Sequence, residues 1–167
     1  NGSTTVQKKR VAILGDSIST FQDWSNNVSN YQYPKNGVYE AFKVTDTYWY
    51  QLIYNKMSNA ELDVNSSYCG STVQDNAAKG KPSFISRYAD LRNPDIILIN
   101  GGTNDSWSYR LPVGNLNFDL SLEELDTYQF AQAYDKLIRL LQREYPSAKI
   151  FLILGDCLRD FPTYTKV

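Results

Sequence analysis

The sequence predicts an α/β protein in which a parallel sheet lies between two layers of helices. Short apolar runs with strand character alternate along the chain with segments whose apolar residues recur at helical spacing. Two of these runs, IILI (96–99) and IFLIL (150–154), are apolar throughout and lack the alternation of a strand with one face in water. Both faces of the sheet should therefore be covered by helices.

Four strands are expected from the apolar runs. Each run is short, is continuous or β-branched in character, and is bounded by Gly, Asp, Asn or Pro. The predicted strands are Val11–Leu14, Glu61–Tyr68, Asp95–Asn100 and Lys149–Gly155.

Helical segments separate these strands. The strongest, Thr127–Glu144, repeats apolar residues every three or four positions and ends before Pro146. Two weaker helical segments precede it, one with Trp49, Leu52, Ile53 and Lys56 at helical spacing and the other with Phe84, Tyr88 and Leu91 along one stripe. The resulting β-α-β-α-β-α-β order predicts a doubly wound sandwich with right-handed crossovers.

Length and composition limit the classes of protein to consider. The chain has 167 residues and a mass of 19.1 kDa, which fits one domain. A hydrophobic content of 42% and a formal charge of −1 argue against disorder and against a nucleic-acid partner. No apolar run approaches the roughly 18–20 residues that a membrane span requires. The abundance of Asn, Ser and Tyr, with 13 tyrosines, favours a secreted or periplasmic protein over a cytoplasmic one.

The first predicted strand runs directly into a serine, in the stretch VAILGDSIST (11–20). Ligands of open parallel sheets bind outside the carboxyl ends of the strands, and Ser17 lies just past such an end. A serine hydroxyl is a weak nucleophile, so it needs a base to take its proton and hydrogen-bond donors to hold the oxyanion formed on attack.

The next two strand ends offer such donors. Gly70 follows the second strand, where a glycine permits a tight turn and leaves its N–H unshielded. Asn104, in the stretch NGGTND (100–105), follows the third and carries a neutral amide donor. If the first strand lies between the other two, at spacings of about 4.8 Å, these residues converge on Ser17. The N–H groups of Ser17 and Gly70 and the Asn104 side chain would then surround one oxygen.

These segments resemble a known family. GDSIS (15–19), the Gly70 turn and GTND (102–105) resemble, in order and spacing, the first three sequence blocks of the SGNH or GDSL hydrolases, which are serine esterases and lipases. The resemblance implies a flavodoxin-like sheet of order 2-1-3-4-5, with no metal or organic cofactor. It also implies that Ser17 is the nucleophile and an oxyanion donor, and that Gly70 and Asn104 complete the oxyanion hole.

The sequence departs from this family at its C-terminal end. The chain has no histidine, and neither the family's D-x-x-H block, which supplies the acid and base, nor its fifth strand is present. This suggests a single SGNH-like domain, residues 1–167, that is truncated at its C-terminus. The sheet would then expose an apolar edge at Lys149–Gly155 through which copies of the chain can self-associate.

Other polar residues near the strand ends are expected to be structural. Asp16 should bond loop backbone, and Asp105 and Asp156 should order loops, because ordinary carboxylates titrate too low to serve as bases at neutral pH. Asn104 has the alternative role of bracing a turn. Two long connections, Thr20–Thr47 and Ser106–Glu124, are rich in aromatic residues, so they should be ordered and would line an acyl or sugar pocket.

The two cysteines, Cys69 and Cys157, follow the second and fourth predicted strands. In the order 2-1-3-4 these strands stand about 14 Å apart, beyond the roughly 7 Å Cα separation of a disulfide. Two free thiols are expected, with Cys69 a small buried filler.

The sequence thus indicates a serine esterase that hydrolyses acyl esters, including acetyl esters, of carbohydrates or small molecules through an acyl-enzyme on Ser17. Its histidine and aspartate would come from sequence outside this chain, so the chain alone should be inactive. Two alternatives remain open on the same fold: a non-catalytic module that binds a glycan or an ester, and an O-acyltransferase.

Overall fold

A parallel sheet of four strands forms the centre of the protein, with the strand order β2-β1-β3-β4. The structure is a computed structural model that describes residues 6–26, 29–35, 37–75 and 81–153. The strands are β1 (Lys9–Gly15), β2 (Ala60–Ser67), β3 (Ile96–Asn100) and β4 (Lys149–Ile153). The predicted fold class, the four strands and their order are confirmed.

The register of the sheet brings three strand ends to the same level. Gly15, the last residue of β1, is aligned with Ser67 of β2 on one side and with Asn100 of β3 on the other. Since the strands are parallel, the segments that leave them begin at one edge of the sheet. This alignment places the GDS segment between the two segments that carry Gly70 and Asn104.

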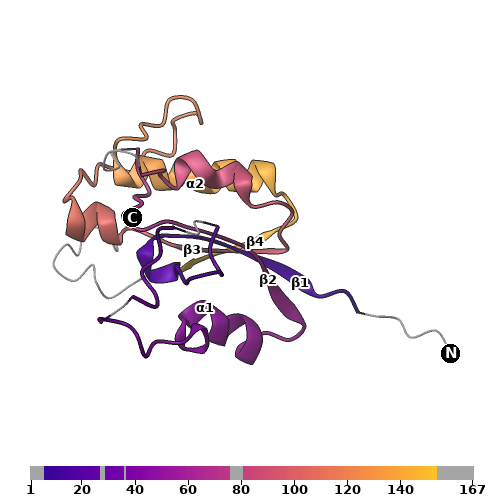
Figure 1. The fold of residues 1–167 in the computed structure, drawn as a ribbon. Coiled ribbons are helices and arrows are strands. Elements are labelled where there is room, and N and C mark those ends of the chain that lie inside the picture. The colour runs from indigo at the N-terminus through magenta and orange to yellow at the C-terminus, as the bar shows by residue number, and fades with distance from the viewer. Residues whose placement is uncertain (1–5, 27–28, 36, 76–80, 154–167) are drawn as a thin grey trace.

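Helices cover both faces of the sheet (Figure 1). One face carries α2 (Phe130–Glu144) and the 3-10 helix η4 (Ile85–Asp90), and the other carries α1 (Tyr48–Tyr50), which continues as the π-helical η3 (Gln51–Lys56). Successive residues of β1 alternate between the two cores. The core under α2 includes Ala12, Leu14, Ile97, Ile99, Leu137 and Leu141, and the core over α1 includes Val11, Ile13, Leu98, Trp49 and Ile53.

Besides the π-helical continuation of α1, two predicted helices differ in detail from those observed. The segment around Arg87 is a 3-10 helix, in which the Ser83 hydroxyl accepts the Ser86 N–H (3.1 Å) and so caps a tight turn. The last helix begins at Phe130 instead of Thr127. The N–H groups of Phe130 and Ala131 donate to the carbonyl oxygens of Pro112 and Val113 (3.0 and 2.8 Å), so loop backbone satisfies its first turn.

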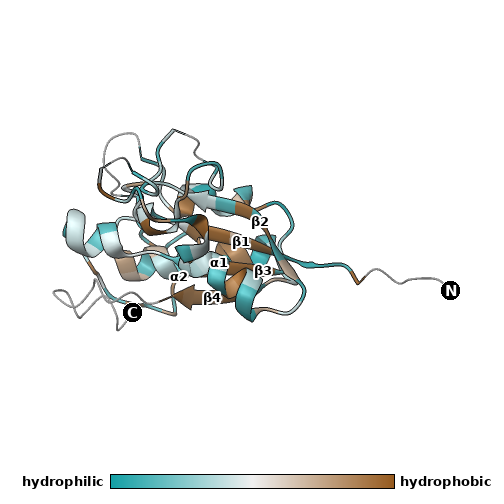
Figure 2. Ribbon diagram, turned by 60° about the horizontal axis from the view of Figure 1, so that its bottom comes forward, coloured by the Kyte–Doolittle hydropathy of each residue, from teal (hydrophilic) through white to brown (hydrophobic). Residues whose placement is uncertain are grey.

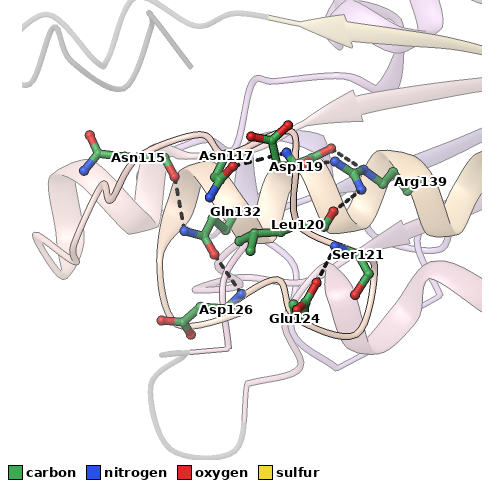
Figure 3. Close-up of polar contacts among 10 residues, drawn as sticks. Asn115, Asn117, Asp119, Leu120, Ser121, Glu124, Asp126, Gln132 and Arg139 are labelled. Carbon is green, nitrogen blue, oxygen red and sulfur yellow. Dashed lines mark hydrogen bonds and ion pairs between the residues drawn. The ribbon is translucent and has the colours of Figure 1, made fainter.

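The two long connections are ordered where the structure describes them. The second is fastened to α2 by side-chain to backbone hydrogen bonds, drawn in Figure 3. Arg139 donates to the Leu120 carbonyl (2.8 Å), and Gln132 donates to the Asn115 carbonyl (3.2 Å). In the first connection, the Gln32 N–H donates to the Thr20 hydroxyl (2.8 Å) and the Gln22 N–H to the Tyr33 carbonyl (2.8 Å).

Strand β4 leaves apolar side chains in water on both of its faces. Phe151 is 49% exposed and Leu152 is 47% exposed, whereas Ile97, Leu98 and Ile99 of β3 are buried. The expectation that β4 is covered on both faces is therefore wrong over Lys149–Ile153, because β4 is the outer strand of the described sheet. Figure 2 shows this apolar strand at the border of the sheet, as expected of an exposed edge. Gly155 lies outside the described residues.

The exposed side of β4 predicts concentration-dependent self-association of the 167-residue chain. Leu152→Lys should reduce this association, because a charge on an apolar edge opposes pairing with a second copy. Sedimentation velocity over a concentration series measures the change. Phe118→Lys is the matched control, since Phe118 is 75% exposed but lies outside the sheet. A wild-type chain that stays monomeric throughout the series contradicts the prediction.

Candidate functional site

Ser17 begins a 3-10 turn, η1 (Ser17–Ser19), that follows the end of β1 directly. The Asp16 carboxylate caps this turn, since its Oδ1 atom accepts the Ile18 N–H (3.0 Å). The Ser17 carbonyl accepts two hydrogen bonds from Thr20, one from its N–H (3.1 Å) and one from its hydroxyl (2.6 Å). The Ser17 backbone is thus fixed on both sides, and the residue itself is half-buried.

Residues from α1 and β2 hold the same turn from below. The Ser19 carbonyl accepts the Trp49 indole N–H (3.1 Å) and the Asn65 amide N–H (2.9 Å). The Ser19 hydroxyl is hydrogen-bonded to the Tyr48 hydroxyl (2.7 Å). Gly15 is also required here, because a Cβ atom at this position would lie 2.6 Å from Ser19 Oγ. The chain has little freedom to move Ser17 away from the strand end.

Gly70 lies in the loop after β2 with a positive φ of 78°, a conformation that favours glycine. The loop starts against the end of β1, where the Tyr68 N–H donates to the Gly15 carbonyl (3.3 Å). A Cβ atom at Gly70 would lie 3.2 Å from the Tyr109 hydroxyl. The position that a side chain would occupy at Gly70 is therefore next to Tyr109, which belongs to the segment that follows β3.

Asn104 is buried at the start of the π-helical turn η5 (Asn104–Ser108), and its side chain is bound at both ends. Nδ2 donates to the Ser71 carbonyl (2.8 Å), and Oδ1 accepts the Ser108 hydroxyl (2.9 Å). Ser71 follows Gly70 directly, so the amide lies against the Gly70 turn. The structure gives Nδ2 no second partner among the described residues, which leaves one of its two N–H donors for a ligand.

Hydrogen bonds thus join the segments of all three predicted site residues at one edge of the sheet. The loop after β2 is bonded to Gly15 on the Ser17 side and to Asn104 on the other. Asp105 adds two more bonds, since its carboxylate accepts the N–H groups of Val73 (2.9 Å) and Gln74 (3.2 Å). The predicted loop-ordering role of Asp105 is confirmed, and Asp156 lies outside the described residues.

Burial changes the protonation of the two carboxyl groups at this edge. It raises the pKa of Asp16 to about 7, with the nearby Asp105 adding to the rise and the Arg87 guanidinium opposing it. Burial also raises the pKa of Asp105 to about 6, so the expectation that this carboxyl titrates near its ordinary low value is wrong. Asp16 bonds loop backbone as predicted, but its Oδ2 atom is buried with no partner among the described residues.

Sequence reasoning did not identify three residues that hold this edge together, namely Tyr48, Asn65 and Arg87. The run Asn65–Ser67 carried a signal, because polar residues at the end of a buried strand must find partners in the interior. The Cys69 thiol is free and half-buried, 4.0 Å from the Thr20 hydroxyl, so it is more exposed than the predicted buried filler. Cys157 lies outside the described residues.

Neither a membrane span nor a metal cluster is found within the described ranges. No helix there is long and apolar enough to cross a bilayer. The same residues contain no group of three or more His, Cys, Asp or Glu side chains that could hold a metal ion.

The raised pKa of Asp16 predicts a specific pH dependence of stability. The ordinary value is 3.8 and the folded value about 7, so ionising Asp16 destabilises the fold as the pH rises between about 4 and about 7. Asp16→Asn keeps an oxygen to accept the Ile18 N–H but cannot ionise. The free energy of unfolding of Asp16→Asn minus that of the wild type should therefore increase across this window and stay constant above it.

Urea denaturation of both proteins at a series of pH values measures this difference. Asp105 is present in both proteins, so its own titration contributes to both curves. A difference between the two proteins that stays constant over the whole window would show that Asp16 is not the titrating group.

The structural and sequence comparisons agree with this arrangement. A family profile described as GDSL-like Lipase/Acylhydrolase matches residues 9–165. A structure from Bacteroides uniformis ATCC 8492, assigned to the GDSL-like lipases, is 36% identical, with a TM-score of 0.75 over 95% of this chain and 78% of its own. One from Bacteroides ovatus ATCC 8483, assigned likewise, is 29% identical, with a TM-score of 0.75 over 97% of this chain and 84% of its own.

More distant structures share the fold alone. A family two carbohydrate esterase from Clostridium thermocellum, in complex with cellohexaose, is 19% identical, with a TM-score of 0.57 over 99% of this chain and 50% of its own. No curated protein matches the chain. The profile match over nearly the whole length and the shared α/β fold, with its parallel strand order β2-β1-β3-β4, show that the chain belongs to the GDSL-like lipase/acylhydrolase family.

Proposed function

We propose that the protein is a serine esterase that works through an acyl-enzyme on Ser17. The Ser17 Oγ atom attacks the ester carbonyl carbon while a base takes the hydroxyl proton. The N–H groups of Ser17 and Gly70 and the Asn104 amide stabilise the resulting oxyanion. Collapse of this intermediate releases the alcohol, which receives the proton, and water then attacks the acyl group to free Ser17.

One observation carries this proposal more than any other. The Asn104 amide donates one N–H to the Ser71 carbonyl, directly beside Gly70, and its second N–H has no partner among the described residues. A neutral, buried donor that is held this firmly costs no reorganisation when charge develops on a substrate oxygen.

The base is proposed to come from outside residues 1–167, as a histidine oriented by an aspartate. The chain contains no histidine. Asp16 is an unsuitable substitute, since it is fully buried and its carboxylate caps the turn after β1. Residues of the two Bacteroides structures that have no counterpart in this chain, which spans 78% and 84% of their lengths, support an outside source.

Acyl esters of carbohydrates, acetyl esters among them, are the proposed substrates. The connection after Ser17 carries a group of aromatic rings, with Tyr33 4.9 Å from Tyr39 and 4.5 Å from Phe42 between ring centroids. Aromatic faces suit the apolar faces of sugar rings. The fold shared with a carbohydrate esterase supports this class by analogy only.

A non-catalytic module that binds a glycan or an ester is the second candidate. The absence of histidine favours it, because histidine is the most common general base, and Asp16, whose pKa burial raises to about 7, is fully buried and caps the turn after β1. An O-acyltransferase, in which a sugar hydroxyl replaces water in the second step, remains the third candidate. Product analysis with and without an added sugar acceptor separates transfer from hydrolysis.

Ser17→Ala should abolish turnover of a short-chain aryl ester, because the variant has no hydroxyl to form the acyl-enzyme. The assay compares the 167-residue chain, the protein expressed to its natural stop codon, and Ser17→Ala in that longer protein. We expect the short chain to be nearly inert and the longer protein to be active.

The matched control is Ser147→Ala, which removes an exposed hydroxyl at the opposite end of the sheet and should leave turnover unchanged. A longer protein that is folded but inert would reject the esterase function and favour the binding module.

Asn104→Ala should lower kcat by about 10²- to 10³-fold with little change in KM, because the donor acts mainly on the oxyanion. Steady-state kinetics on the longer protein measure both constants. Ser147→Ala, at the exposed position used above, is again the control. Equal kcat values for Asn104→Ala and the control would show that Asn104 only braces the turn.

A further inference from the structure

We propose that Arg87 is a positioning residue for this site, because its guanidinium ties the ends of β1 and β2 to the Gly70 turn. The proposal rests on the esterase function proposed above and adds to it a residue that touches no substrate. Arg87 lies on η4, is only 3% exposed, and belongs to no motif of the sequence.

All five N–H donors of the Arg87 side chain have acceptors. Nε donates to the Ser83 carbonyl (3.3 Å), and Nη1 donates to the Ser66 carbonyl and to the Ser66 hydroxyl (3.0 Å). Nη2 donates to the Gly15 carbonyl (3.1 Å) and to the Ser71 hydroxyl (2.7 Å). A guanidinium can satisfy this set because its donors form a rigid planar fork.

The two hydrogen bonds of Nη2 join the segments that carry the proposed oxyanion donors. Gly15 lies two residues before Ser17 in the turn after β1. Ser71 follows Gly70, and its carbonyl accepts the Asn104 amide (2.8 Å). Each of the three proposed donors is therefore within two residues, or one further hydrogen bond, of a group bonded to Nη2. A shift of the guanidinium would move the donors relative to one another.

Stability alone does not explain a charge at this place. No carboxylate among the described residues forms an ion pair with Arg87, and its guanidinium lies near the rings of Tyr68 (4.7 Å) and Phe84 (5.1 Å). Burial lowers the pKa of Arg87 to about 10, so it still carries its charge at neutral pH. An apolar side chain of similar volume would avoid this desolvation. What the guanidinium adds is a set of five hydrogen bonds that fixes three backbone carbonyl groups and two hydroxyl groups relative to one another.

The test uses the protein expressed to its natural stop codon and a short-chain aryl ester. Arg87→Lys keeps the charge and much of the length, but an ammonium cannot reach the same five acceptors. We expect kcat to fall about 10- to 100-fold while KM stays within about two-fold, because displaced donors weaken the transition state more than substrate binding.

Arg139→Lys is the matched control. Arg139 also donates to a backbone carbonyl, that of Leu120 (2.8 Å), and pairs with Asp135 (2.7 Å), but it fastens the loop shown in Figure 3. The Arg139→Lys protein should lose thermal stability while its kcat stays unchanged. A purely structural role for Arg87 predicts the same pattern in both variants, so a folded Arg87→Lys protein with wild-type kcat overturns the proposal.

A second variant tests the connection through Ser71. Ser71→Ala removes one acceptor of Nη2 and should lower kcat about 10-fold. The double variant Arg87→Lys, Ser71→Ala should have the same kcat as Arg87→Lys alone, since both substitutions break the same hydrogen bond between Nη2 and Ser71. A kcat lowered by the product of the two separate losses would contradict the proposal. If Arg87→Lys does not fold, unchanged kcat in Ser71→Ala rejects the proposal. An inactive wild-type protein rejects the esterase function, and the Arg87 role with it.

Discussion

The carboxyl-terminal edge of the sheet buries polar groups that must satisfy one another's hydrogen bonds. The Ser19 carbonyl takes two side-chain donors, the Asp105 carboxylate takes two backbone N–H groups, and the Arg87 guanidinium uses all five of its donors. Each buried group left unpaired would cost about 1–3 kcal/mol. Alternative arrangements of the loops are therefore unfavourable, and the turn that carries Ser17 is restricted to one geometry.

This polar layer also explains how a loop site can be rigid. The proposed oxyanion donors belong to three loops, and loops are usually more mobile than the strands they connect. Here side chains from neighbouring elements hold the loop backbone, as Asn65 and Trp49 do for Ser19. Asp16 is the exception, because one of its carboxylate oxygens is buried without a partner among the described residues. Such costs are commonly kept at functional sites.

Helices bury both faces of β1 and β3, but the two outer strands of the sheet differ. The β2 border continues into the Gly70 loop, which is fastened to the site, while the β4 border exposes Phe151 and Leu152. A family member without a histidine and with an exposed apolar strand is consistent with the proposal that the catalytic base lies outside residues 1–167.

Residue types and their order along the chain were enough to predict the four strands, and the resemblance to the SGNH or GDSL hydrolases predicted their arrangement and the edge that carries Ser17, Gly70 and Asn104. Apolar runs and glycine turns are local signals, so they can be recognised in a linear sequence. The tertiary structure alone decided that η4 is a 3-10 helix, that β4 is exposed, and that Arg87 holds the site. Arg87 and Gly15 are 72 positions apart, and hydrogen bonds between such distant residues leave no periodic pattern in the sequence.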